Sequence, residues 1–154
     1  MEFIKDLPIF REFRKVEDSW NKSRHLILKA PTGSGKSIAL PYLLKKNGLV
    51  RGKILILQPR RIAARMLALH LSRVMQSPLG KKVGYHVRFD KRLDDQTEII
   101  YATDGIILNY LLNNNFPKDI ELLIMDEFHE RSVQIDLSLA VCLKMLEANT
   151  LNFR

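Results

Sequence analysis

Short aliphatic runs alternate with longer segments of helical spacing along most of this 154-residue chain. Runs of β-branched and aliphatic residues predict strands over residues 25–29, 53–58, 83–88, 97–102 and 121–126. Apolar residues at three- and four-residue spacing predict helices over residues 36–46, 60–75, 104–113 and 132–147. Because strands and helices alternate, we expect an α/β fold: a mostly parallel sheet with helices on both faces.

The two ends of this pattern suggest how the chain is organised. An amphipathic helix lying on the domain is predicted by apolar residues at Ile9, Phe10, Phe13, Val16 and Trp20. We therefore expect a helical lead-in over residues 1–23 and one domain over residues 24–154. Pro41 lies inside the helix predicted over residues 36–46, so we expect a kink there. The polar stretch over residues 89–95 has the composition of a turn.

Residues 30–37, Ala-Pro-Thr-Gly-Ser-Gly-Lys-Ser, fit the phosphate-loop pattern G-x-x-x-x-G-K-S with Ala30 in place of the first glycine. Gly33 and Gly35 would let the backbone turn tightly, so that N–H groups and the dipole of the following helix point at phosphate. Lys36 would neutralise the β- and γ-phosphates of ATP, and the Ser37 hydroxyl would ligate Mg²⁺. The residues expected to hold the nucleotide are Thr32, Gly33, Ser34, Gly35, Lys36 and Ser37. The alternative is an ordinary Gly-Ser turn between a strand and a helix.

Two carboxylates, Asp126 and Glu127, come directly after the aliphatic run over residues 122–125. A strand buried on both faces has this composition, and its end would point the carboxylates toward the crevice where open α/β sheets bind ligands. Asp126 would hold Mg²⁺ through water, and Glu127 would orient and deprotonate the attacking water. The metal ligands expected on this basis are Ser37, Asp126 and Glu127. In the alternative, the acidic residues only cap the next helix.

The composition of the chain indicates a polyanionic partner and argues against a disulfide-stabilised, secreted or membrane-spanning protein. The chain carries 25 Lys and Arg against 17 Asp and Glu, a net charge of +8, which indicates nucleic acid unless the charge serves solubility alone. The single Cys142 lies in an apolar helical pattern, so we expect a buried small hydrophobe and no disulfide within the chain. We find no signal-peptide core and no apolar run near the ~20 residues of a membrane span, so we expect a cytoplasmic protein without a membrane partner.

Five segments together resemble one family, the DEAH-box RNA helicases of helicase superfamily 2, and within it the bacterial HrpB-type helicases. They follow the family's order: residues 30–37 as motif I, 58–65 as motif Ia, 83–89 as the hook-shaped turn, 103–108 as motif Ib and 126–132 as motif II. Phe128, in place of the more usual alanine, is the feature that indicates HrpB-type members.

The resemblance implies a first RecA-like domain of the P-loop NTPase class, with ATP and Mg²⁺ as cofactors and single-stranded RNA as partner. It implies a catalytic set of Lys36, Asp126, Glu127 and His129, in which His129 couples the ATP site to a second domain. It places Arg60, Arg61, Arg88, Phe89, Thr103, Asp104 and Gly105 along nucleic acid. The alternatives are a solvated basic helix start for Arg60 and Arg61, and a simple edge strand for residues 83–89.

The chain also departs from the family. His70 stands where many relatives carry an arginine that stacks on adenine, so adenine stacking is not implied here. The Ser-Ala-Thr of motif III and the second RecA-like domain with its arginine fingers lie outside these 154 residues, so we expect a truncated helicase, nearly inactive alone. Two rivals remain. One is a module that binds nucleotide or RNA without turnover; the other is a phosphate-loop kinase, disfavoured because the chain lacks an Arg-rich lid.

Overall fold

The computed structural model describes residues 2–113, 115–150 and 153–154. The chain divides into two compact units, Met1–Arg51 together with Arg154, and Gly52–Phe153. Each unit has its own packing. The expected boundary between residues 23 and 24 stays a prediction.

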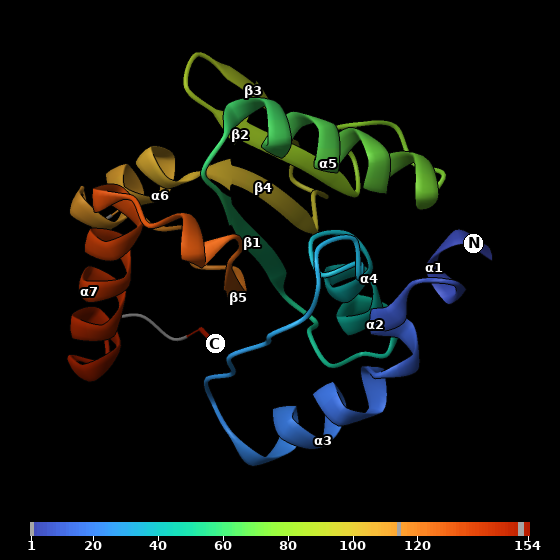
Figure 1. Cartoon of the computed structure of the whole chain (residues 1–154). Helices are drawn as coiled ribbons and strands as arrows, with labels where there is room; N and C mark the ends of the chain where they lie inside the picture. Colours follow the sequence, from blue (N-terminus) through green and yellow to red (C-terminus); the bar gives the residue numbers. More distant parts are fainter. Residues whose placement is uncertain (1, 114, 151–152) are drawn as a thin grey trace. The chain divides into compact units, whose positions relative to one another are not determined.

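The first unit begins with three short helices, α1 (Glu2–Lys5), α2 (Pro8–Arg11) and α3 (Phe13–Lys22) (Figure 1). The single helix predicted for this region is therefore wrong, because the chain leaves helical geometry at Glu12, with φ −91° and ψ 1°. The predicted apolar face is used in part: Ile9, Phe13, Val16 and Trp20 are buried, whereas Phe10 is 38% exposed. Arg154 packs on Trp20, with its guanidinium 4.3 Å from the centre of the Trp20 ring.

The fourth helix, α4 (Ala39–Lys46), begins later than the predicted residue 36. The carbonyl of Gly35 accepts the N–H groups of Ala39 at 2.7 Å and Leu40 at 3.2 Å, so residues 36–38 form turns before the helix. Pro41 consequently lies in the first turn, where the missing N–H costs no helical hydrogen bond. The reason for expecting a kink at Pro41 therefore falls away.

The strand predicted over residues 25–29 does not form in the described structure. This segment has no ladder partner among the described residues, and its side chains are open to solvent: Leu26 is 41% exposed, Ile27 94% and Leu28 38%. A strand exists only by pairing, because its N–H and C=O groups have no partners within the segment. Aliphatic composition alone therefore misled the prediction.

The second unit is built on a five-stranded sheet in the order β3-β2-β4-β1-β5. The strands are β1 (Lys53–Gln58), β2 (Val83–Val87), β3 (Asp90–Arg92), β4 (Ile99–Thr103) and β5 (Ile120–Met125). All neighbours are parallel except β2 and β3, which form an antiparallel hairpin. The four longer strands and the mostly parallel sheet were predicted. The turn predicted over residues 89–95 is wrong in part, because residues 90–92 pair as β3.

Helices α5 (Arg61–Val74), α6 (Asp104–Leu112) and α7 (Val133–Glu147) complete the second unit, with a short 3-10 turn at Phe128–Glu130. The crossover through α5 runs from β1 to β2, and the crossover through α6 runs the opposite way, from β4 to β5. Since parallel crossovers are right-handed, α5 and α6 lie on opposite faces of the sheet. Figure 1 shows α5 along β2 and β4, and α6 beside α7.

The core under α6 and α7 is continuous and apolar. Its buried members are Leu55, Leu57, Ile100, Ala102, Ile107, Leu111, Ile120, Ile135, Cys142 and Phe153. Every second residue of β1 and β4 belongs to it, as expected for strands whose side chains alternate between two faces. Cys142 is buried as predicted, and this burial raises the pKa of its thiol to about 11. No helix in the described part of the chain is long and apolar enough to cross a membrane.

Candidate functional site

The glycine-rich loop of the first unit is a tight turn held by its own backbone. Gly33 has φ +77° and Gly35 φ +96°, conformations that favour glycine, and the N–H of Ser34 donates to the carbonyl of Pro31 at 3.2 Å. Ser34 is buried, and its hydroxyl has no hydrogen-bond partner in the described part of the chain. The tight turn predicted from the two glycines is therefore present, with the N–H of Ser34 used inside the loop; the binding of phosphate by its N–H groups stays a prediction.

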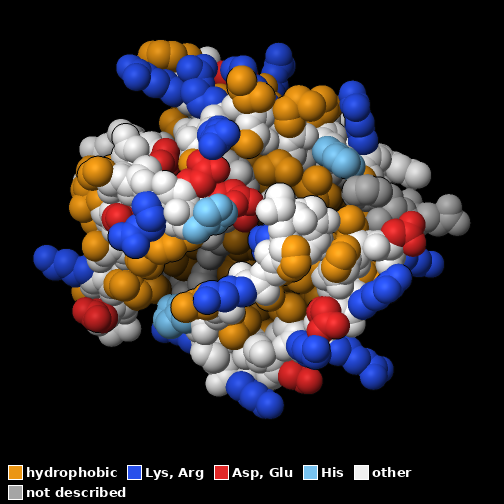
Figure 2. All heavy atoms as spheres, viewed as in Figure 1, with side chains coloured by type: hydrophobic (Ala, Val, Ile, Leu, Met, Phe, Trp, Pro, Cys, Tyr) orange, Lys and Arg blue, Asp and Glu red, His pale blue; other side chains and the backbone are white. Residues whose placement is uncertain are grey.

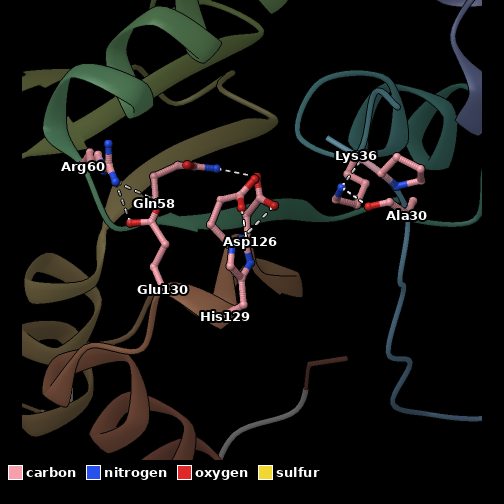
Figure 3. A network of polar contacts seen from close by, with 9 residues as sticks. Ala30, Lys36, Gln58, Arg60, Asp126, His129 and Glu130 are labelled. Atoms are coloured by element: carbon pink, nitrogen blue, oxygen red, sulfur yellow. Dashed lines mark hydrogen bonds and ion pairs between the residues drawn. The ribbon is translucent and has the colours of Figure 1, made fainter. Parts of the chain in front are cut away.

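Lys36 lies over this loop. Its ammonium donates to the carbonyl of Ala30 at 2.6 Å and to that of Pro31 at 2.9 Å (Figure 3). Lys36 and the partly buried Ser37 precede α4 rather than opening it, and Thr32 is exposed on the loop. If a phosphate bound here, the Lys36 ammonium would exchange its hydrogen bonds to two neutral carbonyls for hydrogen bonds to a charged group, which are stronger.

In the second unit, the strand register places Asp126 beside Gln58. Strands β1 and β5 pair Leu57 with Met125, and the ladder continues one step further because the N–H of Asp126 donates to the carbonyl of Leu57 at 3.3 Å. The side-chain amide of Gln58 donates to Oδ2 of Asp126 at 2.6 Å (Figure 3). Both residues are buried, Gln58 at 2% and Asp126 at 7% exposed.

Glu127 follows in a left-handed conformation, with φ 51° and ψ 33°. Its N–H donates to Oδ1 of Asp126 at 3.0 Å, so both carboxylate oxygens of Asp126 already accept one hydrogen bond. The partly buried Glu127 carboxylate lies 3.4 Å from Nδ1 of His129, which is itself largely exposed. The two carboxylates therefore have different neighbours: Asp126 lies beside Gln58, and Glu127 lies beside His129.

Tyr101 lies close enough to Asp126 to be affected by its charge. It is fully buried on β4, and burial, reinforced by the negative charge of Asp126, raises the pKa of its hydroxyl above the ordinary value. The hydroxyl is therefore neutral at physiological pH. No sequence signal singled out this residue, because an aromatic side chain in an apolar strand is usual for a core.

Arg60 and Arg61 lie where β1 gives way to α5. Both side chains are exposed, as expected for residues that would meet a backbone phosphate. Nη2 of Arg60 lies 3.2 Å from both carboxylate oxygens of Glu130 (Figure 3). This link between motif Ia and motif II was not predicted.

Thr103, Asp104 and Gly105 form the junction between β4 and α6. Thr103 is 7% exposed and offers little surface, whereas Gly105 is open, since a Cβ at this position would meet nothing within 4 Å. Asp104 accepts from the N–H of Gly105 at 2.9 Å and from the hydroxyl of Ser132 at 2.8 Å. Ser132 also accepts from the N–H of Ile135 at 3.0 Å, which caps α7. Motif Ib is thereby joined to the end of motif II.

Arg88 and Phe89 form the tip of the β2–β3 hairpin. Phe89 is 88% exposed with φ +66°, and the Arg88 guanidinium lies 4.8 Å from the centre of its ring. An exposed aromatic ring paired with arginine offers a flat surface for a nucleobase. His70 lies elsewhere, on the exposed side of α5.

The charge of the chain is distributed rather than concentrated on the face drawn in Figure 2. Lys and Arg side chains stand at many separate points of that face, and a group of acidic side chains lies among them. The net charge of +8 therefore does not by itself define a binding surface there.

The donor atoms suit Mg²⁺. Hydroxyl and carboxylate oxygens, supplied by Ser37, Asp126 and Glu127, are the hard ligands that this ion prefers. The described residues contain no group of three or more His, Cys, Asp or Glu side chains placed to hold a metal alone. This fits an ion that proteins usually hold through one or two carboxylates together with substrate phosphates and water.

Four of the predicted segments share one edge of the second unit's sheet. Residues 60–61, 88–89, 103–105 and 126–129 follow the ends of β1, β2, β4 and β5, which are all parallel. The model of the DEAD/DEAH box helicase family matches residues 14–153. The chain belongs to this family. The RecA-like fold and the resemblance predicted from the motifs are confirmed.

Relatives of this helicase domain come from bacteria and eukaryotes. It is 34% identical over 140 residues to the ATP-dependent RNA helicase HrpB of Escherichia coli, covering 91% of this chain and 17% of that protein. It is 38% identical over 146 residues to the Arabidopsis thaliana pre-mRNA-splicing factor ATP-dependent RNA helicase DEAH10, covering 94% of this chain and 20% of that protein. The chain therefore spans about a fifth of these relatives' lengths.

The structure agrees with the sequence comparison. The crystal structure of Escherichia coli DEAH/RHA helicase HrpB matches with a TM-score of 0.88 and 33% identity, covering 96% of this chain and 19% of that chain. HrpB is thus a relative by both sequence and structure, as the sequence predicted.

Proposed function

We propose that this chain is the part of an ATP-dependent RNA helicase that binds Mg-ATP and carries the residues for its hydrolysis. The names of its relatives, ATP-dependent RNA helicases, support this proposal, and so does the family to which the chain belongs. In the whole protein, hydrolysis would be coupled to movement along nucleic acid or unwinding.

One observation carries the proposal: the residues assigned to catalysis and to nucleic acid in the second unit follow the carboxyl ends of neighbouring parallel strands. Open α/β sheets bind ligands at this edge. Acidic residues that only capped a helix would not need the buried, doubly hydrogen-bonded position of Asp126.

The residues would divide the chemistry between them. Lys36 and the N–H groups of the loop would hold the β- and γ-phosphates, and Ser37 and Asp126 would hold Mg²⁺. Mg²⁺, when bound, supplies charge neutralisation on the phosphate oxygens. Glu127 would accept a proton from the attacking water, because its carboxylate is partly buried and, in the described structure, no hydrogen bond ties it to Gln58 as Asp126 is tied. His129, beside Glu127, would relay the state of this site to a second RecA-like domain.

Single-stranded RNA would run along the exposed residues Arg60, Arg61, Arg88 and Phe89, with motif Ib beside it. Arginine side chains contact backbone phosphate without regard to sequence, and the Phe89 ring can stack on any base. A cytoplasmic location is part of the proposal and is supported only by the single buried cysteine.

Turnover tests this function. In the chain joined to a second RecA-like domain, Glu127→Gln should keep ATP binding and lose about 10²-fold or more in phosphate release, because an amide cannot accept the proton. Glu147→Gln, an exposed change of the same kind at the end of α7, is the matched control. Equal turnover in the Glu127 variant and the parent would remove Glu127 as the base. ATP binding without turnover in the parent would favour the binding-only alternative.

A further inference from the structure

Gln58 is an unusual residue for its position. It ends the strand Ile54-Leu55-Ile56-Leu57, whose side chains are almost completely buried, and is itself only 2% exposed. An aliphatic side chain would fill this place without losing hydration, whereas burying an amide is costly unless it is hydrogen-bonded. Packing alone therefore does not explain a glutamine here.

The hydrogen bond that Gln58 makes goes to one specific atom. Its Nε2 donates to Oδ2 of Asp126 at 2.6 Å, between residues 68 apart in the sequence. Oδ1 of the same carboxylate accepts from the N–H of Glu127 at 3.0 Å. With one donor on each oxygen, the plane of the carboxylate is fixed, and the remaining lone pairs are left for another ligand.

We propose that Gln58 is a positioning residue for the metal-binding carboxylate of Asp126. This rests on the proposed function, in which Asp126 holds Mg²⁺. Hydrogen bonds to a carboxylate that holds a metal set its orientation, and loss of such supporting bonds around a metal site typically lowers metal affinity by about 10- to 100-fold. Gln58 itself contacts neither nucleotide nor metal in this assignment. It acts through Asp126, and it lies two positions before Arg60, on the segment assigned to RNA.

The test separates metal binding from nucleotide binding, with the 154-residue chain as the protein. The affinity for ADP is measured by calorimetry with EDTA and again with Mn²⁺, and bound Mn²⁺ is counted by electron paramagnetic resonance. Gln58→Leu should leave the EDTA affinity within about two-fold of the parent and lower the gain from Mn²⁺ by about 10-fold. A residue with only a structural role would change both affinities alike, or neither.

Two further variants make the result decisive. Gln58→Met keeps the length of the side chain but has no N–H to donate to Asp126, so it should lower the Mn²⁺ gain as well, and it serves if the leucine variant does not fold. Thr97→Val is the matched control. Thr97 is fully buried and its hydroxyl donates to the carbonyl of Gly80 at 2.8 Å, but it precedes β4, at the opposite end of that strand from Thr103. It should lower the unfolding free energy and leave the Mn²⁺ gain unchanged.

The outcomes are distinct. A parental Mn²⁺ gain in both Gln58 variants would overturn the inference and leave the proposed function standing. Loss of the gain in Thr97→Val as well would also overturn it, since any loosening of the unit would then suffice. A parent that binds no ADP, or binds it without a gain from Mn²⁺, would overturn the proposed function and this inference with it.

Discussion

Nη2 of Arg60 lies 3.2 Å from both carboxylate oxygens of Glu130, a residue 70 positions further along the chain. The pair joins the segment assigned to RNA with the segment assigned to hydrolysis. Because it is exposed, with 72% of the Arg60 side chain and 35% of the Glu130 side chain accessible, it contributes little to stability. An RNA phosphate would compete with Glu130 for the same guanidinium.

Replacement of Arg60 and Arg61 by alanine should weaken single-stranded RNA binding about equally for every base sequence. Each lost phosphate contact should also flatten the plot of log affinity against log salt by roughly 0.7. Fluorescence anisotropy over a salt series measures both. The charge-matched control is Arg73→Ala with Lys144→Ala, both exposed and outside the assigned path. A salt slope equal to the parent's would show that Arg60 and Arg61 are solvated surface charges.

The two loop glycines should differ in their response to alanine. At Gly35 a Cβ would lie 2.9 Å from Ile9 Cγ2 and 2.9 Å from Leu7 Cδ1, in addition to the strain of φ +96°. At Gly33, with φ +77°, nothing lies within 4 Å. Gly33→Ala should therefore cost about 1 kcal/mol and Gly35→Ala clearly more, up to about 3 kcal/mol. Chemical unfolding of the two variants side by side measures the difference, and equal losses would count against this packing.

Ser132, which caps α7, and Ser138, which lies within it, should respond differently to alanine. Ser132 caps the helix and donates to Asp104, so Ser132→Ala should lower the unfolding free energy by about 1 kcal/mol. Ser138 is fully buried and its hydroxyl has no partner in the described part of the chain, so Ser138→Ala should be neutral or stabilising. Urea unfolding gives both values. A destabilising Ser138 variant would indicate a partner that this packing does not show.

Cys142 gives a prediction about pH. Burial raises the pKa of its thiol from 9.0 to about 11, so the folded chain binds this proton more tightly than the unfolded chain. Its contribution to stability is therefore complete below about pH 9 and is lost as the pH rises toward 11. Alkylation by iodoacetamide at pH 8 should be at least about 10-fold slower in the folded chain than in urea. Equal rates would show that the thiol is accessible.

Sequence predicted those elements whose own residues determine them. The runs that become β1 and β5 are mostly aliphatic, with four apolar residues in succession in each, and α5, α6 and α7 are long segments rich in apolar residues, so local composition and spacing were sufficient. Residues 25–29 have a similar composition but no strand to pair with in the described structure. The sequence of one segment does not show whether a partner strand will be available. Strand β3 was missed because Asp90-Lys91-Arg92 is wholly polar, and only its hairpin partner makes it a strand.

The candidate site shows the same division. Lys36, Asp126 and Glu127 were assigned from local motifs, since their neighbours in sequence define them, and their roles stay predictions. The contacts of Gln58 with Asp126 and of Arg60 with Glu130 depend on the register of β1 against β5, which no local pattern fixes. The start of α4 was predicted too early. Gly35 has a positive φ, and its carbonyl accepts hydrogen bonds from several N–H groups at the start of the helix, so residues 36–38 form turns instead.

The most direct test of the central claim, that this chain binds a nucleotide through its glycine-rich loop, is calorimetry of Mg-ADP with the parent and with Lys36→Ala. Charge-assisted hydrogen bonds of about 1.5–3 kcal/mol would be lost with the ammonium, so affinity should fall by about 10- to 100-fold. Lys46→Ala, at the end of α4, removes the same charge from the same unit and should bind like the parent. Equal affinity in the Lys36 variant and the parent would contradict the claim.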